Sequence, residues 1–266
     1  MTIASPSVAA AARTVLETAE PAAKIKAARR AARAWRQGYL AHCFDTAMPA
    51  APARPDRPEL LSPGRMPRRG KAGSERGRIA LLHALAHIEF TAIDLAFDLV
   101  GRFGALFPRS FVDDWISVGA DEAIHFALLD RRLRALGSGY GALPAHAGLW
   151  EAADATSDDV VARLAVVPMA LEARGLDVTP ATVERFVAAG DVASARILQR
   201  IYHDEIRHVG FGTKWFAIAC EANGFAPVAH WRSLILARFR GIVKAPFNGS
   251  ARDSAGLTRE FYADLA

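Results

Sequence analysis

Two short segments of the sequence each carry a glutamate and a histidine three residues apart. Glu122 and His125 lie in ADEAIHF, and Glu205 and His208 lie in HDEIRHV. On a helix, residues at positions i and i+3 share one face about one turn apart, so such a pair can bind the same metal ion. Acids and histidines also meet at this spacing by chance, so a single pair would indicate little. Here the pattern occurs twice.

A further glutamate precedes each motif at the same interval. Glu89 lies 33 residues before Glu122 (122 − 89 = 33). Glu172 lies 33 residues before Glu205 (205 − 172 = 33). These side chains fall among apolar residues at helical spacing, which predicts that they point into a protein interior. Because a buried ionised carboxylate is costly without a compensating partner, we expect bound cations there. The alternative is that the carboxylates pair with arginines or cap shorter helices.

Four carboxylates and two imidazoles form an oxygen-rich ligand set, which suits iron or manganese and lacks the thiolates of structural zinc. A glutamate from each of two helices and a Glu-x-x-His from each of two others is the ligand set of ferritin-like di-iron and di-manganese bundles. We predict two iron ions, with manganese or a mixed manganese–iron pair as alternatives. The predicted ligands are Glu89, Glu122, His125, Glu172, Glu205 and His208.

Four residues beside the ligands are expected to support the centre. Asp121 and Asp204 are predicted to accept a hydrogen bond from the ring N–H of the histidine in the opposite motif, the alternative being an exposed acid. Tyr202, three positions before Glu205, is the candidate catalytic residue, as a redox or proton relay, and the alternative is a packed core tyrosine. Pro168 is predicted to kink its helix one turn before the glutamate ligand.

Other imidazole and aromatic side chains are not predicted to bind metal. His83 and His87 lie off the helix face of Glu89, so we expect hydrogen-bonded or surface histidines. The loop from 137 to 148 connects the second and third long helices, where ferritin-like bundles have their long crossover. We expect an entrance near this loop, shaped by Tyr140, His146 and Trp150.

Helical periodicity and breaks in the sequence define the elements that would position these residues. We expect four long helices, over 75–101, 109–136, 156–174 and 191–221. The third is expected to be capped by Thr156 or Ser157 and to end at Gly175. Thr179-Pro180 is expected to open a short extra helix. No strand pattern is found, which predicts an all-α fold, a four-helix bundle with additional N-terminal and C-terminal helices.

The N-terminal region has the pattern of an amphipathic helix followed by a proline-rich break. Over 8–43, apolar residues recur at Ile25, Ala28, Ala32, Trp35 and Tyr39. The other faces are basic, with Lys24, Lys26, Arg29, Arg30, Arg33 and Arg36. A solvated helix face explains such a charge run, and contact with RNA, DNA or an acidic partner is the alternative.

Composition shifts predict four segments. They are an N-terminal arm (1–47), a Pro/Arg-rich linker (48–74), the bundle (75–224) and a partly helical C-terminal extension (225–266). A hydrophobic content of 52%, a charged content of 23% and a net charge of +5 are those of a soluble globular protein. Cys43 and Cys220 match no redox or metal spacing, and no signal peptide or membrane-length apolar run is found. We therefore expect a cytoplasmic protein.

Several stretches of the sequence resemble a known family, the bacterial ferritin-like proteins catalogued as a domain of unknown function. The likeness is in LLHALAHIEFTAIDLAFDLV, DWISVGADEAIHF, YGALPAHAGLWEAA, RLAVVPMALEARGLDVTP and IYHDEIRHV. It extends from about Arg54 to Phe225 and leaves the N-terminal arm outside. The resemblance implies the same bundle and metal centre, and it implies no settled reaction.

Three functions are consistent with these features. We expect an oxygen-dependent di-iron oxidase or hydroxylase of a small organic substrate, because long extra segments can wall a pocket around a redox centre. Iron oxidation, storage or buffering is the second hypothesis, although the added segments would crowd a storage cage. Hydroxylation of an RNA base is the third and draws on Arg29, Arg30 and Arg33. Oxygen and a small molecule are the expected partners. No membrane partner is expected, and the electron donor, a nucleic acid and a homodimer stay open.

Overall fold

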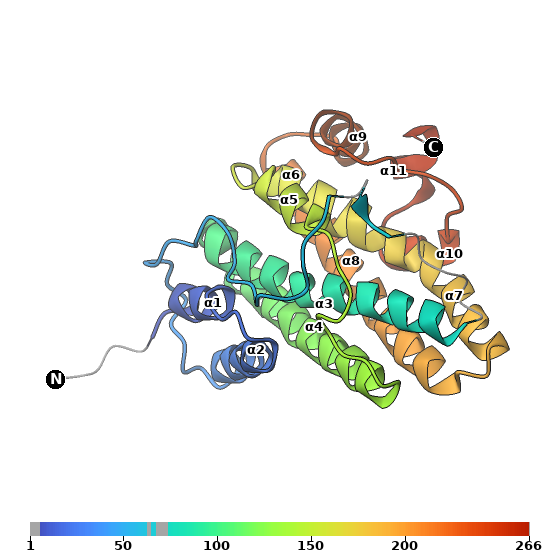
Figure 1. Cartoon of the computed structure of the whole chain (residues 1–266). Coiled ribbons are helices and arrows are strands. Elements are labelled where there is room, and N and C mark those ends of the chain that lie inside the picture. The colour runs from blue at the N-terminus through green and yellow to red at the C-terminus, as the bar shows by residue number, and fades with distance from the viewer. Residues whose placement is uncertain (1–5, 63–64, 68–73, 266) are drawn as a thin grey trace. The chain divides into compact units, whose positions relative to one another are not determined.

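The computed structural model describes residues 6–62, 65–67 and 74–265, and their regular structure is helical (Figure 1). Within these ranges β pairing is limited to two isolated bridges, Ser7 with Ala41 and Leu60 with Ala145. The all-α prediction is confirmed. The chain divides into two compact units, of which the first ends at Ala147 and the second consists mainly of the residues from Gly148 onward. The predicted bundle segment, 75–224, has residues in both units, and the four-segment division stays a prediction.

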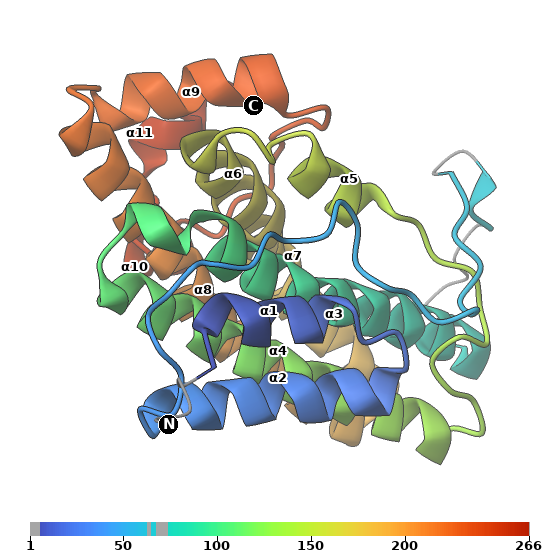
Figure 2. The same cartoon turned by 90° about the vertical axis from the view of Figure 1, so that its left-hand side faces the viewer.

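The first unit contains two long helices and a pair of shorter ones. They are α1 (Val8–Leu16), α2 (Pro21–Arg36), α3 (Glu75–Phe103) and α4 (Arg109–Ala135). α3 packs along α4, while α1 packs on α3 and α2 packs on α4 (Figure 2). The predicted helices 75–101 and 109–136 are confirmed within two residues.

The buried face of α3 does not include every apolar residue of the helix. Ile88, next to Glu89, is 45% exposed. The fully buried positions recur at steps of three and four and include Leu82, Ala86, Phe90, Ile93, Phe97 and Val100. Glu89 is nevertheless buried, because it lies beside Phe90 at the edge of this face. α3 is apolar over more than one face, so periodicity alone did not select the face that packs.

α3 is also apolar enough to be compared with a membrane span. Together with the 3-10 turn η2 (Gly104–Leu106) it forms a helical stretch of 32 residues that passes the length and composition criteria for crossing a membrane. However, 67% of its most apolar window is buried inside the protein. This degree of burial is that of a core helix packed against α1 and α4.

The N-terminal arm consists of two helices instead of the single helix expected over 8–43. α1 ends at Leu16, and α2 begins at Pro21, the first helical position, where a missing N–H has no cost. The Glu20 carboxylate accepts hydrogen bonds from the backbone N–H groups of Ala22 and Ala23. This cap fixes the start of α2 and explains the break.

A buried ion-pair cluster joins α2 and the linker to α3. Lys24 is fully buried and pairs with Asp94, which lies in the middle of α3. Arg54 Nη1 lies 2.6 Å from the second oxygen of Asp94. Burial raises the pKa of Asp94, and the charges of Lys24 and Arg54 oppose that rise. Lys24 is therefore not part of the exposed basic face in which it was predicted.

The linker and the loop between α4 and α5 run beside each other within the first unit. Leu61 N donates to Ala145 O at 2.8 Å, and Ala145 N donates to Glu59 O at 2.9 Å. The described linker residues, 48–62 and 65–67, form no extended helix, as predicted from their prolines. Part of the predicted linker, 63–64 and 68–73, lies outside the described residues.

The second unit is built around two long helical stretches. Its elements are α5 (Gly148–Asp154), α6 (Val160–Val166), the π-helical turn η3 (Val167–Glu172), α7 (Ala173–Ala188), α8 (Val192–Ala222), α9 (Pro227–Arg238), α10 (Gly249–Ser254), α11 (Arg259–Tyr262) and the 3-10 turn η4 (Ala263–Leu265). α6, η3 and α7 follow one another without a break and pack against α8. The predicted fourth helix, 191–221, and the partly helical tail are confirmed.

The predicted limits of the third helix are wrong at both ends. Its cap is Asp159, whose carboxylate accepts from Val161 N and Ala162 N. The helix also continues through Gly175 and Pro180 to Ala188.

A tertiary contact explains why Pro180 does not open a new helix. Proline has no N–H to donate to the carbonyl four residues earlier, which belongs to Leu176. Asn248 Nδ2 donates to that oxygen at 3.2 Å. The Leu176 carbonyl, which loses its usual helical partner at Pro180, is therefore hydrogen-bonded by the segment before α10. No local sequence pattern reveals this partner.

Candidate metal centre

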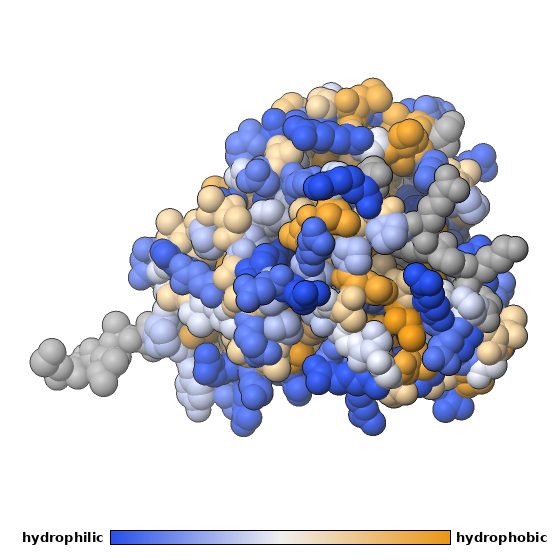
Figure 3. All heavy atoms as spheres, in the orientation of Figure 1, coloured by the Kyte–Doolittle hydropathy of each residue, from blue (hydrophilic) through white to orange (hydrophobic). Residues whose placement is uncertain are grey.

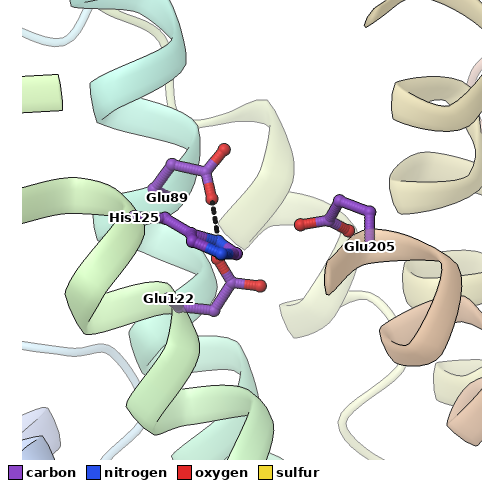
Figure 4. Close-up of side chains that lie close together, drawn as sticks. All are labelled: Glu89, Glu122, His125 and Glu205. Carbon is purple, nitrogen blue, oxygen red and sulfur yellow. Dashed lines mark hydrogen bonds and ion pairs between the residues drawn. The ribbon is translucent and has the colours of Figure 1, made fainter. Parts of the chain in front are cut away.

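In the first unit α3 and α4 bring three of the predicted ligands together. Glu89 comes from α3, and Glu122 and His125 come from adjacent turns of α4 (Figure 4). His125 Nδ1 lies 3.2 Å from Glu122 Oε2 and 3.3 Å from Glu89 Oε2. One ligand atom from each residue lies within 4.8 Å of those of the others. These distances are close enough for one cation to bind all three.

Burial makes this carboxylate pair unfavourable by itself. Glu89 is 5% exposed, Glu122 is 1% exposed and His125 is fully buried. Burial raises the pKa of Glu89 well above its ordinary value, the neighbouring charge of Glu122 raises it further, and the hydrogen bond to His125 opposes both. Two ionised carboxylates this close repel each other. A bound cation would remove the repulsion and compensate the burial.

A glycine controls the separation of α3 and α4 one turn before Glu122. A Cβ on Gly119 would lie 2.6 Å from Cε2 of Phe97, which is closer than side chains pack. The absence of a side chain lets α4 approach the ring of Phe97 on α3. This contact helps to set the distance across which Glu89 meets Glu122 and His125.

In the second unit α8 carries the other Glu-x-x-His motif in a similar geometry. His208 is fully buried, and its Nδ1 lies 3.5 Å from Glu205 Oε1. Glu205, which is also drawn in Figure 4, has 12% of its side chain exposed. Both motifs therefore place a buried imidazole nitrogen beside the glutamate one turn earlier. The equal spacing of the two motifs in the sequence corresponds to a similar local geometry.

Glu172 is half-buried and is the last residue of the π-helical turn η3. Single π-helical turns inside α-helices are frequent at functional sites, because they turn side chains away from the regular helical phase. Pro168, for which a kink was predicted, lies at the start of this turn. The irregularity one turn before Glu172 is therefore a widened turn.

The turn η3 requires a glycine on α8. A Cβ on Gly212 would lie 2.5 Å from Cβ and 2.6 Å from Cγ of Pro168, and a proline ring cannot rotate away. We predict that Gly212→Ala lowers the free energy of unfolding by about 1–3 kcal/mol through overpacking. The measurement is urea denaturation followed by circular dichroism.

Gly210→Ala is the matched control for Gly212→Ala, on the same helix. A Cβ at position 210 would lie 3.8 Å from Ala255, which is an ordinary contact. Because alanine favours the helix by about 1 kcal/mol over glycine, Gly210→Ala should be neutral or stabilising. Equal effects of the two substitutions would show that the contact with Pro168 does not limit the packing.

One family model matches nearly the whole chain. The family is described as Protein of unknown function (DUF455), and the match covers residues 17–263. The chain belongs to this family. An uncharacterised protein of Haemophilus influenzae is also 41% identical to this DUF455 chain over 214 residues, which is 78% of the chain and 74% of that relative. No solved structure matches.

The DUF455 match corrects the extent of the resemblance. The likeness was placed between about Arg54 and Phe225, yet the family region includes α2 in the N-terminal arm and most of the C-terminal extension. The fold gives a reason, because α2 packs on α4 and buries Lys24 against Asp94. The arm is a structural part of the first unit.

The two aspartates predicted to orient the histidines are half-buried in this DUF455 chain. Asp204 pairs with residues of its own helix, since Arg200 Nε lies 3.1 Å and Arg207 Nη2 lies 3.9 Å from its carboxylate oxygens. The predicted hydrogen bonds from Asp121 and Asp204 to the histidines stay predictions.

Tyr202 is tied to the C-terminal part of the second unit. Its hydroxyl oxygen accepts a hydrogen bond from Asn248 Nδ2 at 3.0 Å, and the residue is half-buried. The same Asn248 amide donates to Leu176 O. A relay role for Tyr202 stays a prediction, and the structure adds a positioning contact that the sequence did not indicate.

His83 and His87 are buried, hydrogen-bonded histidines, which confirms one of the two predicted roles. His83 Nε2 accepts from Gly141 N at 2.9 Å, and His87 Nδ1 lies 2.9 Å from the Tyr140 hydroxyl. Burial lowers the pKa of His87 to about 4, so this imidazole is neutral at pH 7. Tyr140 packs against both rings, and the predicted entrance near it stays a prediction.

Sequence reasoning did not predict the buried cluster of Lys24, Arg54 and Asp94, and it placed Lys24 on the exposed basic face. A signal was present, since Asp94 interrupts the apolar run FTAIDLAFDLV in the middle of α3. An acid at such a position needs a cation. Its partners are far away in the sequence and could not be named from it.

Proposed function

We propose that this DUF455 protein binds two metal ions, iron in the first place, and acts as an oxygen-dependent oxidase or hydroxylase of a small organic substrate. The observation that carries the proposal is the buried convergence of Glu89, Glu122 and His125. The matched pair, Glu205 and His208, supports it independently.

The ion pairs of other buried acids support a bound cation beside Glu89. Asp94 is paired with Lys24 and Arg54, and Asp177 is paired with Arg252 through two hydrogen bonds of 2.8 and 2.7 Å. The charged neighbours of Glu89 are instead Glu122 and His125, and neither a lysine nor an arginine is among the causes of its shifted pKa. A metal ion would give Glu89 the compensation that arginine or lysine gives elsewhere.

The donor set fits iron or manganese. Carboxylate oxygens with one imidazole nitrogen per metal are the ligands these ions accept, and no thiolate is included. We propose that the doubled sequence pattern supplies one centre, to which the second half adds Glu172, Glu205 and His208. The four carboxylates would balance the charge of two divalent ions, and each histidine would provide a neutral donor.

The chemistry of the reaction would come from the bound metals, which can accept and donate electrons in reactions with oxygen. The protein residues would hold the ions and keep water away. His125 serves the first of these tasks, because its Nδ1 already faces both carboxylates of the first unit. The glutamates can accommodate a change of charge because each offers two oxygens in more than one binding mode.

Two observations agree with the expected cytoplasmic location, which we propose together with the function. Cys43 and Cys220 are both free thiols, as is usual where proteins are kept reduced. The most apolar helix, α3, is largely buried inside the protein.

Metal content tests the centre. We expect about two iron or manganese ions per chain in protein purified without added metal, by analogy with dinuclear carboxylate sites. Glu122→Ala and His208→Ala should each reduce the content by at least half, measured by elemental analysis. Glu184→Gln, an exposed glutamate of α7, is the control and should retain the full content.

The outcomes separate the functions. Metal-free protein, or variants that retain the full metal content, would contradict the centre. If the metal is present, oxygen uptake with a chemical reductant and a panel of small organic substrates tests the enzyme. Oxygen uptake that stops once the iron is oxidised, from particles of many subunits, would favour iron storage.

A further inference from the structure

The outer face of α2 carries a row of exposed cations. The exposed basic residues are Lys26, Arg29, Arg30, Arg33 and Arg36. None of the five forms an ion pair with any residue in the described part of the chain. Each of the five has at least one of the others three or four residues away, so they share one side of the helix. In Figure 3 the surface where Figure 1 draws α2 is mainly hydrophilic.

The opposite side of α2 is fixed firmly in the first unit. Ala28, Ala32 and Trp35 are buried, and Trp35 Nε1 donates to Asp113 Oδ1 at 2.7 Å. Lys24 is buried against Asp94, so the cation that belongs to the core is separated from the outer row. The helix thus presents its charges from a rigid support, and Figure 2 shows α2 on the outside of α1 and α4.

The row is extended at its C-terminal end by a residue from α4. The guanidinium of Arg109 stacks over the ring of Trp35, 3.7 Å from its centroid, and this side chain is exposed. Asp113 accepts the indole hydrogen bond of Trp35. The folded unit therefore adds a sixth exposed positive charge, which stacks on the residue that precedes Arg36.

Like charges at helical neighbours repel each other and weaken the helix. The row contains such pairs at 26/29, 26/30, 29/33, 30/33 and 33/36, with no acid between them. A partner with regularly spaced negative charges would reverse this effect. We propose that the outer face of α2 binds the phosphodiester backbone of a nucleic acid, without reading its bases.

The dimensions and side-chain types favour nucleic acid. At 1.5 Å of rise per residue, the row from Lys26 to Arg36 is about 15 Å long. One strand carries a phosphate per 3.4 Å of axis, so the row faces about four phosphates. Four of the five cations are arginines, whose planar guanidinium binds phosphate through two parallel hydrogen bonds.

A membrane surface is a poorer match. Helices that lie in a lipid interface insert large apolar side chains beside their cations. The exposed helical positions between Pro21 and Arg36 hold only alanines besides the five basic residues. The face therefore has the charge for anionic lipid and lacks the apolar side chains that would anchor it.

Fluorescence anisotropy with a labelled 20-base-pair DNA duplex tests this surface, in the full-length protein, at salt concentrations from 50 to 200 mM. We expect the duplex to bind. The logarithm of the association constant should fall linearly with the logarithm of the salt concentration, with a slope of about −4. Arg29→Gln combined with Arg33→Gln should weaken binding by about tenfold to a hundredfold and reduce the slope by about 2. Circular dichroism checks that the variant is folded.

Arg185→Gln combined with Arg196→Gln is the matched control. These exposed arginines lie on α7 and α8, have no ion pair among the described residues and change the net charge equally. Binding by this control should stay within about twofold of the wild type, because its arginines are not part of the row on α2 and change only the net charge. Chelating the metal should leave binding unchanged, so this proposal and the metal centre can fail independently.

Three results would overturn the proposal. The first is no binding of the duplex at 50 mM salt by the intact protein. The second is an equal loss of affinity in both double variants, which would indicate a net-charge effect. The third is tighter binding to vesicles containing anionic phospholipid, or to polyglutamate, than to the duplex at the same salt concentration.

Discussion

Replacing Asp94 with alanine is expected to destabilise the protein by about 3–5 kcal/mol, because it leaves a buried lysine without its partner. Lys24 and Asp94 are both fully buried, and the pKa of Lys24 is already lowered by burial despite the opposing attraction of Asp94. In the variant, the lysine must lose its proton or draw water into the first unit. Urea denaturation measures the loss in the free energy of unfolding.

Asp98→Ala is the matched control for Asp94→Ala. Asp98 is also fully buried and lies one turn further along α3, but its partner, Arg102, is 23% exposed. Arg102 can turn toward water when it loses the carboxylate, so the cost should be smaller. A loss in Asp94→Ala no larger than in Asp98→Ala would contradict the account of the buried cluster.

A second substitution tests the origin of the effect. Lys24→Met removes the buried positive charge and keeps much of the apolar stem. Combined with Asp94→Ala it should recover part of the lost stability, because no unpaired ammonium remains in the core. Arg54 can reach solvent, since 21% of its side chain is exposed. Losses that simply add in the double variant would show that the two charges do not interact.

Glu89→Gln is expected to change stability in opposite directions with and without metal. In metal-free protein Glu89 must either take up a proton on folding or stay ionised beside Glu122, and both are unfavourable at pH 7. The substitution removes this cost and should stabilise the fold by about 1–3 kcal/mol. In metal-loaded protein it removes a negatively charged ligand and should lower the melting temperature. Thermal melts before and after chelation, compared with the wild type, measure both effects.

The pH dependence has a definite sign. The folded-state pKa of Glu89 is raised well above its unfolded value, chiefly by burial and then by Glu122. The neutral form of Glu89 is therefore favoured in the folded protein. The stability of the fold is least affected by Glu89 below its unfolded pKa of about 4.3, where the carboxyl group is protonated in both states. As pH rises from there through the raised folded-state pKa, this stability is lost.

Metal-free wild type should thus lose stability as pH rises from the unfolded pKa of Glu89, about 4.3, through its raised folded-state pKa. Metal-free Glu89→Gln should lose less stability over the same range. Urea denaturation of both proteins at a series of pH values measures the difference. Identical pH profiles would mean that Glu89 does not titrate in the fold. A Glu89→Gln variant that is less stable than wild type even without metal would contradict the proposed repulsion.

The sequence by itself determined the fold class and the chemistry-bearing pattern. Helical periodicity predicted α3, α4 and α8 within about two residues, because long amphipathic helices leave a strong signal. The Glu-x-x-His spacing predicted that His125 lies beside Glu122 and His208 beside Glu205, since positions three apart on a helix share a face whatever the tertiary structure.

Only the tertiary structure decided which residues meet across helices. Glu89 lies near His125 because Gly119 lets α4 approach Phe97 on α3. The spacing of 33 residues between Glu89 and Glu122 does not reveal how close the two helices pack. The helix continues through Pro180 because Asn248 satisfies Leu176 O from the C-terminal segment. Lys24 leaves the basic face because Asp94 draws it inward. Helical periodicity is a local property of the chain, whereas burial, packing distance and the pairing of charges depend on neighbours that are remote in sequence.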